Sequence, residues 1–382
     1  MVITYFSDVG GTLASMIMKV LFLRSNPIDP YPRCEKAMNA LAELGISVRA
    51  IGWDREGRAS ITTPPPNVEW ISIPCAYGKG FKSIYSHILW QLALIGRLLR
   101  ERSTYTHIHA FDLDTIFPAL AMKFFFQKQV VYDIADRYAD RFLIAIIKHF
   151  FWFLDRCALV ASDVVIVSSE AAWERANRIV PGKAILIYNT PPLITAFMPA
   201  SHNSSFSLAF IGTLSKGKFL LEMADIVKRH CRWRFDIGGY GNLENSLRDA
   251  LQSIPNIFFH GRLSYEETLM LYVRSDVLFI LCDPMIPQYQ NAAPNKIFEA
   301  MMLGKPILVA RGTGMDALVE KTGCGIVLDY YNSAEVEKAL IYLKQHPDVR
   351  RIMGERGRAA YEREYSWRAM EERLHTIYRS TS

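Results

Sequence analysis

Short apolar runs recur along the chain, and longer amphipathic stretches separate them. The runs are rich in Val, Ile, Leu and Phe and are bounded by turn residues, so each predicts a buried β-strand. In the first half they span residues 19–24, 47–51, 68–73, 107–111, 129–132, 164–168 and 184–188. In the second half they span residues 207–211, 234–237, 257–260, 277–280, 307–310 and 325–328. Apolar strands that alternate with helices are typical of parallel sheets in doubly wound α/β layers.

A proline-rich segment, residues 189–205, interrupts this alternation and is the best candidate for a linker. We expect Rossmann-like domains over residues 18–195 and 206–360, followed by a C-terminal helix over residues 361–382. Because open α/β sheets bind ligands at the carboxyl ends of their strands, a cleft between the domains is the expected binding region. The strand at 19–24 has the character of a first strand, so residues 1–17 are expected to be an N-terminal extension.

Composition supports this organisation. The 382 residues are too many for one ordinary core, and 50% hydrophobic with 21% charged residues is typical of a globular protein. The net charge of +6 is too small to indicate a nucleic-acid binder. The 6 cysteines are scattered, without metal-ligand spacing, which favours reduced thiols in the cytoplasm and no structural zinc. The most apolar stretch, residues 142–167, is interrupted by charges, and neither a membrane span nor a signal peptide is expected.

The most informative local pattern lies just before the strand at 307–310. A short apolar helix is expected to start at Pro294 or Asn295, where an Asx side chain can cap free amides. Free amides at a helix N-terminus attract phosphate, and Lys296 adds a positive charge there. Glu299, one turn later, suits the two hydroxyls of a ribose. The pattern indicates a nucleotide site, and a capped helix with a solvated Glu is the alternative.

Several blocks in the second half, taken in order, carry a resemblance to a known family. They span residues 210–218, 238–241, 260–262, 275–277, 294–301 and 304–306. In these blocks the chain resembles the GT-B-fold glycosyltransferases, and among them the retaining family often called family 4, or glycosyl transferases group 1. The resemblance implies two Rossmann-like domains and a last helix that packs back on the first domain. It also implies donor-side contacts at Gly212, Thr213, Lys216, Lys218, Gly239, Arg262, Asn291, Pro294, Asn295, Lys296, Ile297 and Glu299.

The chain departs from the family pattern at three positions. Asn291 stands where the first of two signature glutamates contacts the donor sugar, so the identity of the sugar stays open. Thr213 replaces a common Arg, which leaves Lys216 or Lys218 as the cation for the diphosphate. Ala135 replaces a histidine on the catalytic side.

Acceptor-side candidates follow the strands of the first half: Arg33, Asp112, Asp136 and Arg137. Asp112, Asp136 and Lys218 are the catalytic candidates. Asp112-Leu113-Asp114 invites comparison with a metal-binding Asp-x-Asp, but Asp114 is better explained as a helix N-cap. His107 and His109 are interpreted as core residues, and a surface salt bridge is the alternative role for Arg33.

The resemblance implies a hexosyltransferase-type enzyme, class EC 2.4, of polysaccharide or glycolipid synthesis. It would move a sugar from a nucleoside-diphosphate sugar to a glycan or lipid-linked hydroxyl, with retention, without a metal and without a cofactor. A sugar-nucleotide 2-epimerase and a non-catalytic nucleotide-binding member are the alternatives. Lys and Arg outnumber Asp and Glu between residues 79 and 156, where aromatic amphipathic helices are expected. This pattern suggests peripheral association with the anionic inner face of the cell membrane, and core burial is the alternative.

Overall fold

A computed structural model describes residues 18–28, 31–58, 63–75, 81–135, 145–194, 205–290 and 293–380. The chain divides into two compact units. One contains the residues up to Ala110 together with Phe117–Val130, and the other contains Phe111–Ile116 together with Val131–Ser380. The expected extension at residues 1–17 lies outside the described residues.

The first sheet has the strand order β3-β2-β1-β4-β5-β6-β7 among the described residues. Its strands are β1 Lys19–Arg24, β2 Ser47–Asp54, β3 Val68–Ser72, β4 His107–Phe111, β5 Gln129–Ile134, β6 Val164–Val167 and β7 Ala184–Leu186. β1 pairs in parallel with β2 and with β4. Every strand expected in the first half is therefore confirmed, with ends shifted by up to three residues.

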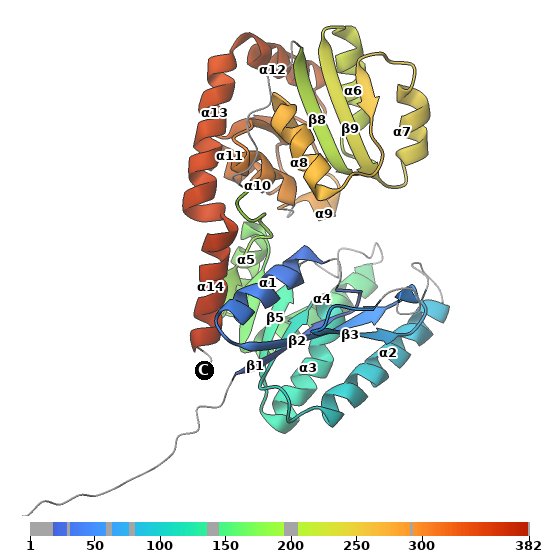
Figure 1. The fold of residues 1–382 in the computed structure, drawn as a ribbon, viewed down its shortest axis with the longest axis vertical. Helices are drawn as coiled ribbons and strands as arrows, with labels where there is room; N and C mark the ends of the chain where they lie inside the picture. Colours follow the sequence, from blue (N-terminus) through green and yellow to red (C-terminus); the bar gives the residue numbers. More distant parts are fainter. Residues whose placement is uncertain are drawn as a thin grey trace, which may run out of the picture. The chain divides into compact units, whose positions relative to one another are not determined.

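Helices connect these parallel strands except β2 and β3, between which the described residues contain no α-helix. They are α1 Pro32–Glu43, α2 Phe81–Arg100, α3 Leu113–Phe126, α4 Ala145–Ala161 and α5 Glu170–Ile179 (Figure 1). Gly45, with φ of 76°, follows α1 and allows the chain to turn back toward β2. Because α3 begins at Leu113, Asp114 lies inside its first turn and Asp112 precedes the helix. The prediction that Asp114 is the N-cap was wrong by two positions.

The second sheet has the order β10-β9-β8-β11-β12-β13 among the described residues. Its strands are β8 Phe206–Thr213, β9 Trp233–Tyr240, β10 Ile257–Phe259, β11 Val277–Ile280, β12 Ile307–Ala310 and β13 Gly325–Leu328. The strand order runs outward in both directions from the neighbouring strands β8 and β11. This topological switch is where doubly wound sheets open a crevice at the carboxyl ends of their strands.

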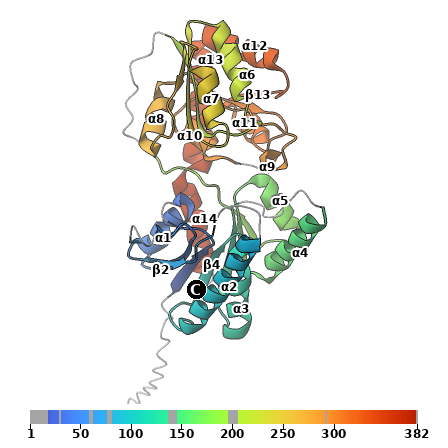
Figure 2. The ribbon, with the colours of Figure 1, turned by 90° about the vertical axis from the view of Figure 1, so that its right-hand side faces the viewer.

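Helices cover both faces of the second sheet. They are α6 Leu220–Arg229, α7 Glu244–Leu251, α8 Tyr265–Arg274, α9 Pro287–Gln290, α10 Asn295–Met302, α11 Asp316–Thr322 and α12 Ser333–Gln345. Figure 2 shows α8 on one side of the strands and α6 on the other. Both faces of the strands are therefore buried, which explains their nearly continuous apolar sequences.

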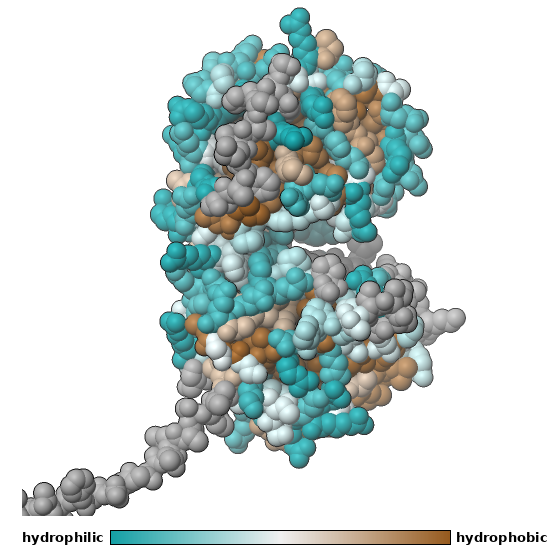
Figure 3. All heavy atoms as spheres, viewed as in Figure 1, coloured by the Kyte–Doolittle hydropathy of each residue, from teal (hydrophilic) through white to brown (hydrophobic). Residues whose placement is uncertain are grey.

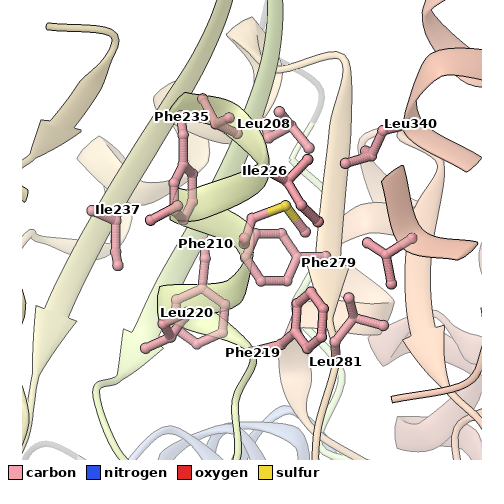
Figure 4. Packing of buried hydrophobic residues seen from close by; sticks show 14 of the residues in the cluster. Leu208, Phe210, Phe219, Leu220, Ile226, Phe235, Ile237, Phe279, Leu281 and Leu340 are labelled. Atoms are coloured by element: carbon pink, nitrogen blue, oxygen red, sulfur yellow. The ribbon is translucent and has the colours of Figure 1, made fainter. Parts of the chain in front are cut away.

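Aromatic and branched side chains on one face of this sheet pack against α6, α7 and α12 to form a core cluster (Figure 4). The ring centroid of Phe279 on β11 lies 5.4 Å from that of Phe210 on β8 and 5.7 Å from that of Phe235 on β9. Leu340 of α12 and Ile226 of α6 are buried in the same cluster. This packing fixes the strands whose carboxyl ends carry the candidate site.

The chain ends in a run of helices: α13 Pro347–Ala360, the π-helix η3 Tyr361–Tyr365 and α14 Trp367–Ser380. The buried hydroxyl of Tyr361 donates to the carbonyl of Pro191 at 2.7 Å. On α14, a guanidinium nitrogen of Arg373 donates to the carbonyl of Leu186, at the end of β7, at 2.8 Å. These bonds tie the last helices to the segment that follows the first sheet.

No helix in the described part of the chain is long and apolar enough to cross a membrane. The interrupted stretch at 142–167 overlaps α4, which ends at Ala161, and β6.

Candidate nucleotide-binding site

The carboxyl ends of β8 and β9 bring two glycines together. Gly212 pairs with Gly239 in the parallel register. Gly239 has φ of 130°, and a Cβ atom on it would lie 1.7 Å from the carbonyl oxygen of Gly212. Only glycine fits there, because any side chain would collide with the neighbouring backbone. The pair leaves bare backbone beside the topological switch, at the ends of β8 and β9, where a ligand can approach closely.

Helix α10 starts beside this bare backbone. It begins at Asn295, with Pro294 in the N-cap position and no side chain bonded as a cap. The expectation that an Asx side chain caps this end was therefore wrong. The amide of Ile297 donates to the carbonyl of Pro294 at 3.1 Å, so the amides of Asn295 and Lys296 are those that would meet an anionic ligand. Asn295 is exposed at this end.

Lys296 lies at the centre of the site. It is 8% exposed, and its Nζ lies 3.2 Å from the ring centroid of Phe210. A Cβ built on Gly212 would be 3.8 Å from the same Nζ, so the ammonium group adjoins the glycine pair. Burial, and after it the neighbouring Lys218, hold the pKa of Lys296 well below its usual value. A buried ammonium group held near a second cation favours an anionic ligand.

Lys218 and Cys282 complete this cluster from the loops that follow β8 and β11. The amide of Asp283 donates to the carbonyl of Gly217 at 2.9 Å, which joins the two loops. Burial lowers the pKa of Lys218. Burial also raises the pKa of the Cys282 thiol to about 11, although both lysines act in the opposite direction. Cys282 is therefore a neutral thiol between two lysines, and it provides no charge to offset them.

Glu299 lies one turn after Lys296 and is also buried, at 7% exposed. Burial, and after it the Glu299 carboxylate, raise the pKa values of the Tyr265 and Tyr272 hydroxyls. The hydroxyl of Tyr272 donates to the carbonyl of Ile211 at 3.1 Å. The explanation of Glu299 as a solvated helix residue was therefore wrong.

The other donor-side candidates surround this centre. Thr213, the last residue of β8, and Lys216, in the loop that follows, are both exposed. Arg262, also exposed, follows β10, and its guanidinium carbon lies 4.5 Å from the ring centroid of Tyr240 at the end of β9. Ile297 is buried on α10. Asn291 lies outside the described residues.

A small hollow next to α10 includes residues that the sequence did not single out. Ile297 and Ala293 form one side of it, and Ser169, Glu170 and Tyr188 form another. Ser169 caps α5 by accepting a hydrogen bond from the amide of Ala172 at 3.3 Å. These residues follow the carboxyl ends of β6 and β7, and that position was the signal that could have identified them.

The acceptor-side candidates of the first half are placed as follows. Asp112 has φ of 59°, and its Oδ1 accepts a hydrogen bond from the amide of Ala135 at 3.1 Å. Asp112 therefore joins the ends of β4 and β5. Arg33, in the first turn of α1, is 5% exposed, so its alternative role in a surface salt bridge was wrong. Asp136 and Arg137 lie outside the described residues.

The two histidines of β4 belong to the core, as expected. His107 is 5% exposed and His109 is fully buried. The ring of His109 stacks on that of Phe22, with centroids 4.7 Å apart.

Comparisons with known proteins agree with this geometry. Residues 217–376 match a family model described as glycosyl transferase-like. The chain is 28% identical over 146 residues to the GDP-mannose-dependent monoacylated alpha-(1-6)-phosphatidylinositol monomannoside mannosyltransferase of Corynebacterium glutamicum, a match that covers 38% of each protein. It is 21% identical over 326 residues to the sulfoquinovosyl transferase SQD2 of Arabidopsis thaliana, which covers 79% of this chain and 61% of that protein. The chain spans between 38% and 61% of the length of the curated relatives it matches.

Solved structures show the same fold over nearly the whole chain. A sucrose-phosphate synthase from Thermosynechococcus elongatus superimposes with a TM-score of 0.75 at 14% identity, covering 95% of this chain and 99% of that one. Anabaena HepE in complex with UDP superimposes with a TM-score of 0.70 at 15% identity, covering 95% and 100%. The expected GT-B fold and the resemblance to GT-B glycosyltransferases are confirmed, and the assignment to family 4 stays a prediction.

Proposed function

We propose that this protein is a glycosyltransferase that moves a sugar from a nucleoside-diphosphate sugar to an acceptor hydroxyl. The observation that carries the proposal is the position of Lys296. Its buried ammonium group adjoins the glycine pair beside the topological switch, and Glu299 follows one helical turn later. The Lys296 cation and the bare backbone of the glycine pair suit a diphosphate, and the Glu299 carboxylate suits the ribose that follows it.

The proposed reaction exchanges one bond at the anomeric carbon. The bond from that carbon to the diphosphate breaks, and its electron pair leaves with the diphosphate. A bond to the acceptor oxygen forms, and the acceptor proton passes to an oxygen of the departing phosphate. Retention would follow from attack on the face that the leaving group occupies, as the family resemblance implies.

The described residues suit the leaving-group side of this reaction. The charge that develops on the diphosphate would be neutralised by Lys296, Lys218 and the first amides of α10, and we propose that no metal is needed. A bound diphosphate would raise the pKa of these lysines, because an opposite charge favours the protonated form. The proposed ribose contact is Glu299.

The acceptor is proposed to be a glycan or a lipid-linked hydroxyl in polysaccharide or glycolipid synthesis. The name of one relative supports a lipid-linked acceptor, because that protein is a phosphatidylinositol monomannoside mannosyltransferase. A cytoplasmic enzyme bound peripherally to the inner face of the cell membrane would meet such an acceptor. Arg33 and Asp112 are the described residues proposed to act on the acceptor side.

Release of nucleoside diphosphate from uridine-, guanosine- and adenosine-linked sugars tests the proposal. We expect one donor to be hydrolysed slowly in the absence of acceptor. Lys296→Ala and Glu299→Ala should weaken nucleoside-diphosphate binding roughly tenfold to a hundredfold, since each removes a charged contact. The matched control is Lys338→Ala, an exposed lysine on α12.

Each other outcome argues against the proposal. Binding without hydrolysis by any donor would favour a non-catalytic nucleotide-binding protein. Appearance of the 2-epimer of the donor sugar would favour an epimerase. Unchanged affinity in both variants would show that the nucleotide binds elsewhere.

A further inference from the structure

Helix α2 carries two apolar faces. Trp90, Leu94 and Leu98 are fully buried. A second stripe is exposed: Ile84 at 59%, Ile88 at 53%, Leu92 at 62% and Leu99 at 37%. At 3.6 residues per turn, the centres of the two stripes lie about 120° apart around the helix. Covering a sheet requires only one apolar face, so the fold of this domain does not account for the second.

The end of α3 adds aromatic side chains to the same region. Phe124, Phe125 and Phe126 are 69%, 78% and 36% exposed. The guanidinium carbon of Arg102, just after α2, lies 5.6 Å from the ring centroid of Phe126. The two helices lie side by side in both ribbon views (Figures 1 and 2). We call the exposed apolar residues of both helices the α2–α3 face: Ile84, Tyr85, Ile88, Leu92, Leu99, Phe124, Phe125 and Phe126.

Basic groups border this face. Arg100 and Arg102 are exposed at the end of α2, and Lys123 lies on the last turn of α3. Helix α2 contains no Asp or Glu. The acidic residue that follows it, Glu101, is held by Arg97 at 2.9 Å and by Arg49 at 3.1 Å. The border is therefore cationic, and Figure 3 shows apolar side chains gathered on the surface where Figure 1 places α2.

Helix α4, in the other unit, repeats the pattern. Ile146, Phe150, Phe153 and Val160 are 82%, 56%, 63% and 53% exposed. Their spacing of four, three and seven residues places them on one side of the helix. Lys148 lies on the same helix, with its Nζ 5.3 Å from the ring centroid of Trp152.

We propose that the α2–α3 face docks on a bilayer that contains anionic lipid. We choose a bilayer as the binding partner because the basic side chains at the border of the face complement the charge of anionic lipid headgroups. Exposed Phe and Leu side chains enter the boundary between headgroups and acyl chains, while Arg and Lys at the border meet lipid phosphates. The α2–α3 face would be the surface through which the protein associates peripherally with the membrane. This docking does not depend on the transfer reaction, because it requires no donor.

The test uses the full chain and sedimentation with vesicles, without any nucleotide. We expect binding to phosphatidylcholine vesicles with roughly 30% phosphatidylglycerol, little binding to phosphatidylcholine alone, and loss of binding as salt is raised. Leu92→Ser with Phe125→Ser should reduce the bound fraction roughly tenfold, because both insert apolar surface. Arg100→Gln with Arg102→Gln should reduce binding to anionic vesicles only.

Ile352→Ser on α13, where the side chain is also exposed at 39%, is the matched control and should bind as the parent does. Because the changed side chains are exposed, all variants should keep the parental melting temperature and the parental rate of donor hydrolysis. Failure of donor hydrolysis with intact vesicle binding would overturn only the proposed reaction. Equal vesicle binding by the parent and by both double variants would overturn the docking surface. So would a dimer of the parent that the Leu92→Ser, Phe125→Ser double variant no longer forms, because a second copy of the chain would then cover this face.

Discussion

At the scale of single residues, we expect the buried lysine of the site to lower the free energy of unfolding. Lys296 is buried beside Lys218, and burial opposes its charge. Such residues are kept for function when the fold would be more stable with an apolar side chain. We expect Lys296→Met to raise the free energy of unfolding by about 1 kcal/mol and to weaken nucleoside-diphosphate binding. Urea unfolding and titration calorimetry measure the two effects, and a variant that is less stable than the parent would contradict the first.

The same residue predicts a pH dependence. The folded-state pKa of Lys296 lies below the usual value of 10.5, so the unfolded chain binds more protons between these two values. Stability therefore rises with pH across that interval, and the penalty is complete below the folded-state pKa. We expect the unfolding free energy of the parent to increase with pH relative to that of Lys296→Met. Parallel pH profiles of the two proteins would show that Lys296 is protonated alike in both states.

The glycine pair gives a prediction for backbone packing. Gly239→Ala should cost about 3 kcal/mol of unfolding free energy, because the new Cβ would meet the carbonyl oxygen of Gly212 and the backbone must move. The matched control is Gly261→Ala, which has φ of 66° but no neighbouring atom within 4 Å. It should cost about 1 kcal/mol, the strain of the left-handed conformation alone. Equal losses in urea unfolding would mean that the close approach is not rigid.

Sequence patterns predicted the candidate residues of the site better than the residues that surround them. Lys296 and Glu299 were found from their positions at the start of a helix, because such chemistry depends on neighbours in sequence. Their burial depends on Phe210, Tyr265 and other residues far along the chain, which no local pattern reveals. Glu170 was missed although it closely follows the carboxyl end of β6, a position that favours a ligand contact.

At the scale of elements, each expected strand was found, since short apolar runs between turn residues are a strong signal. Errors gathered at helix starts. Asp114 was expected to cap α3, but Asp112 adopts a positive φ and the helix begins between the two. The π-helix η3 was not foreseen, because a single insertion in the hydrogen-bond ladder has no clear sequence signature.

The π-helix carries a prediction of its own. Tyr361 is fully buried, and its hydroxyl donates to the carbonyl of Pro191 at 2.7 Å. Tyr361→Phe removes the donor and leaves that carbonyl unpaired, which should cost about 1 kcal/mol of unfolding free energy. Tyr342→Phe, at an exposed position on α12, should cost almost nothing. If urea unfolding gives the two variants equal stability, the bond does not stabilise the folded chain.

At the scale of the whole molecule, the repeated alternation of strands and helices predicted two doubly wound sheets, and the resemblance predicted the GT-B fold. A fold of this kind serves many chemistries, so function is argued from the site. Binding at the site stabilises the whole chain, because a ligand that binds only the folded state raises its stability. The increase is about 2.7 kcal/mol when the ligand is a hundredfold above its dissociation constant.

This coupling makes the melting temperature a readout of base and ribose recognition. Among uridine, guanosine and adenosine diphosphates, we expect one to raise the melting temperature by several degrees. If Glu299 holds the ribose, the 2′-deoxy form of that nucleotide should stabilise the parent less than the ribonucleotide does. In Glu299→Ala the two forms should stabilise equally, because the partner of the 2′-hydroxyl is gone.

A preference for the ribonucleotide that survives in Glu299→Ala would assign ribose recognition to another residue. Loss of stabilisation by both forms in Lys296→Ala, with Lys338→Ala unchanged, would place the diphosphate on Lys296.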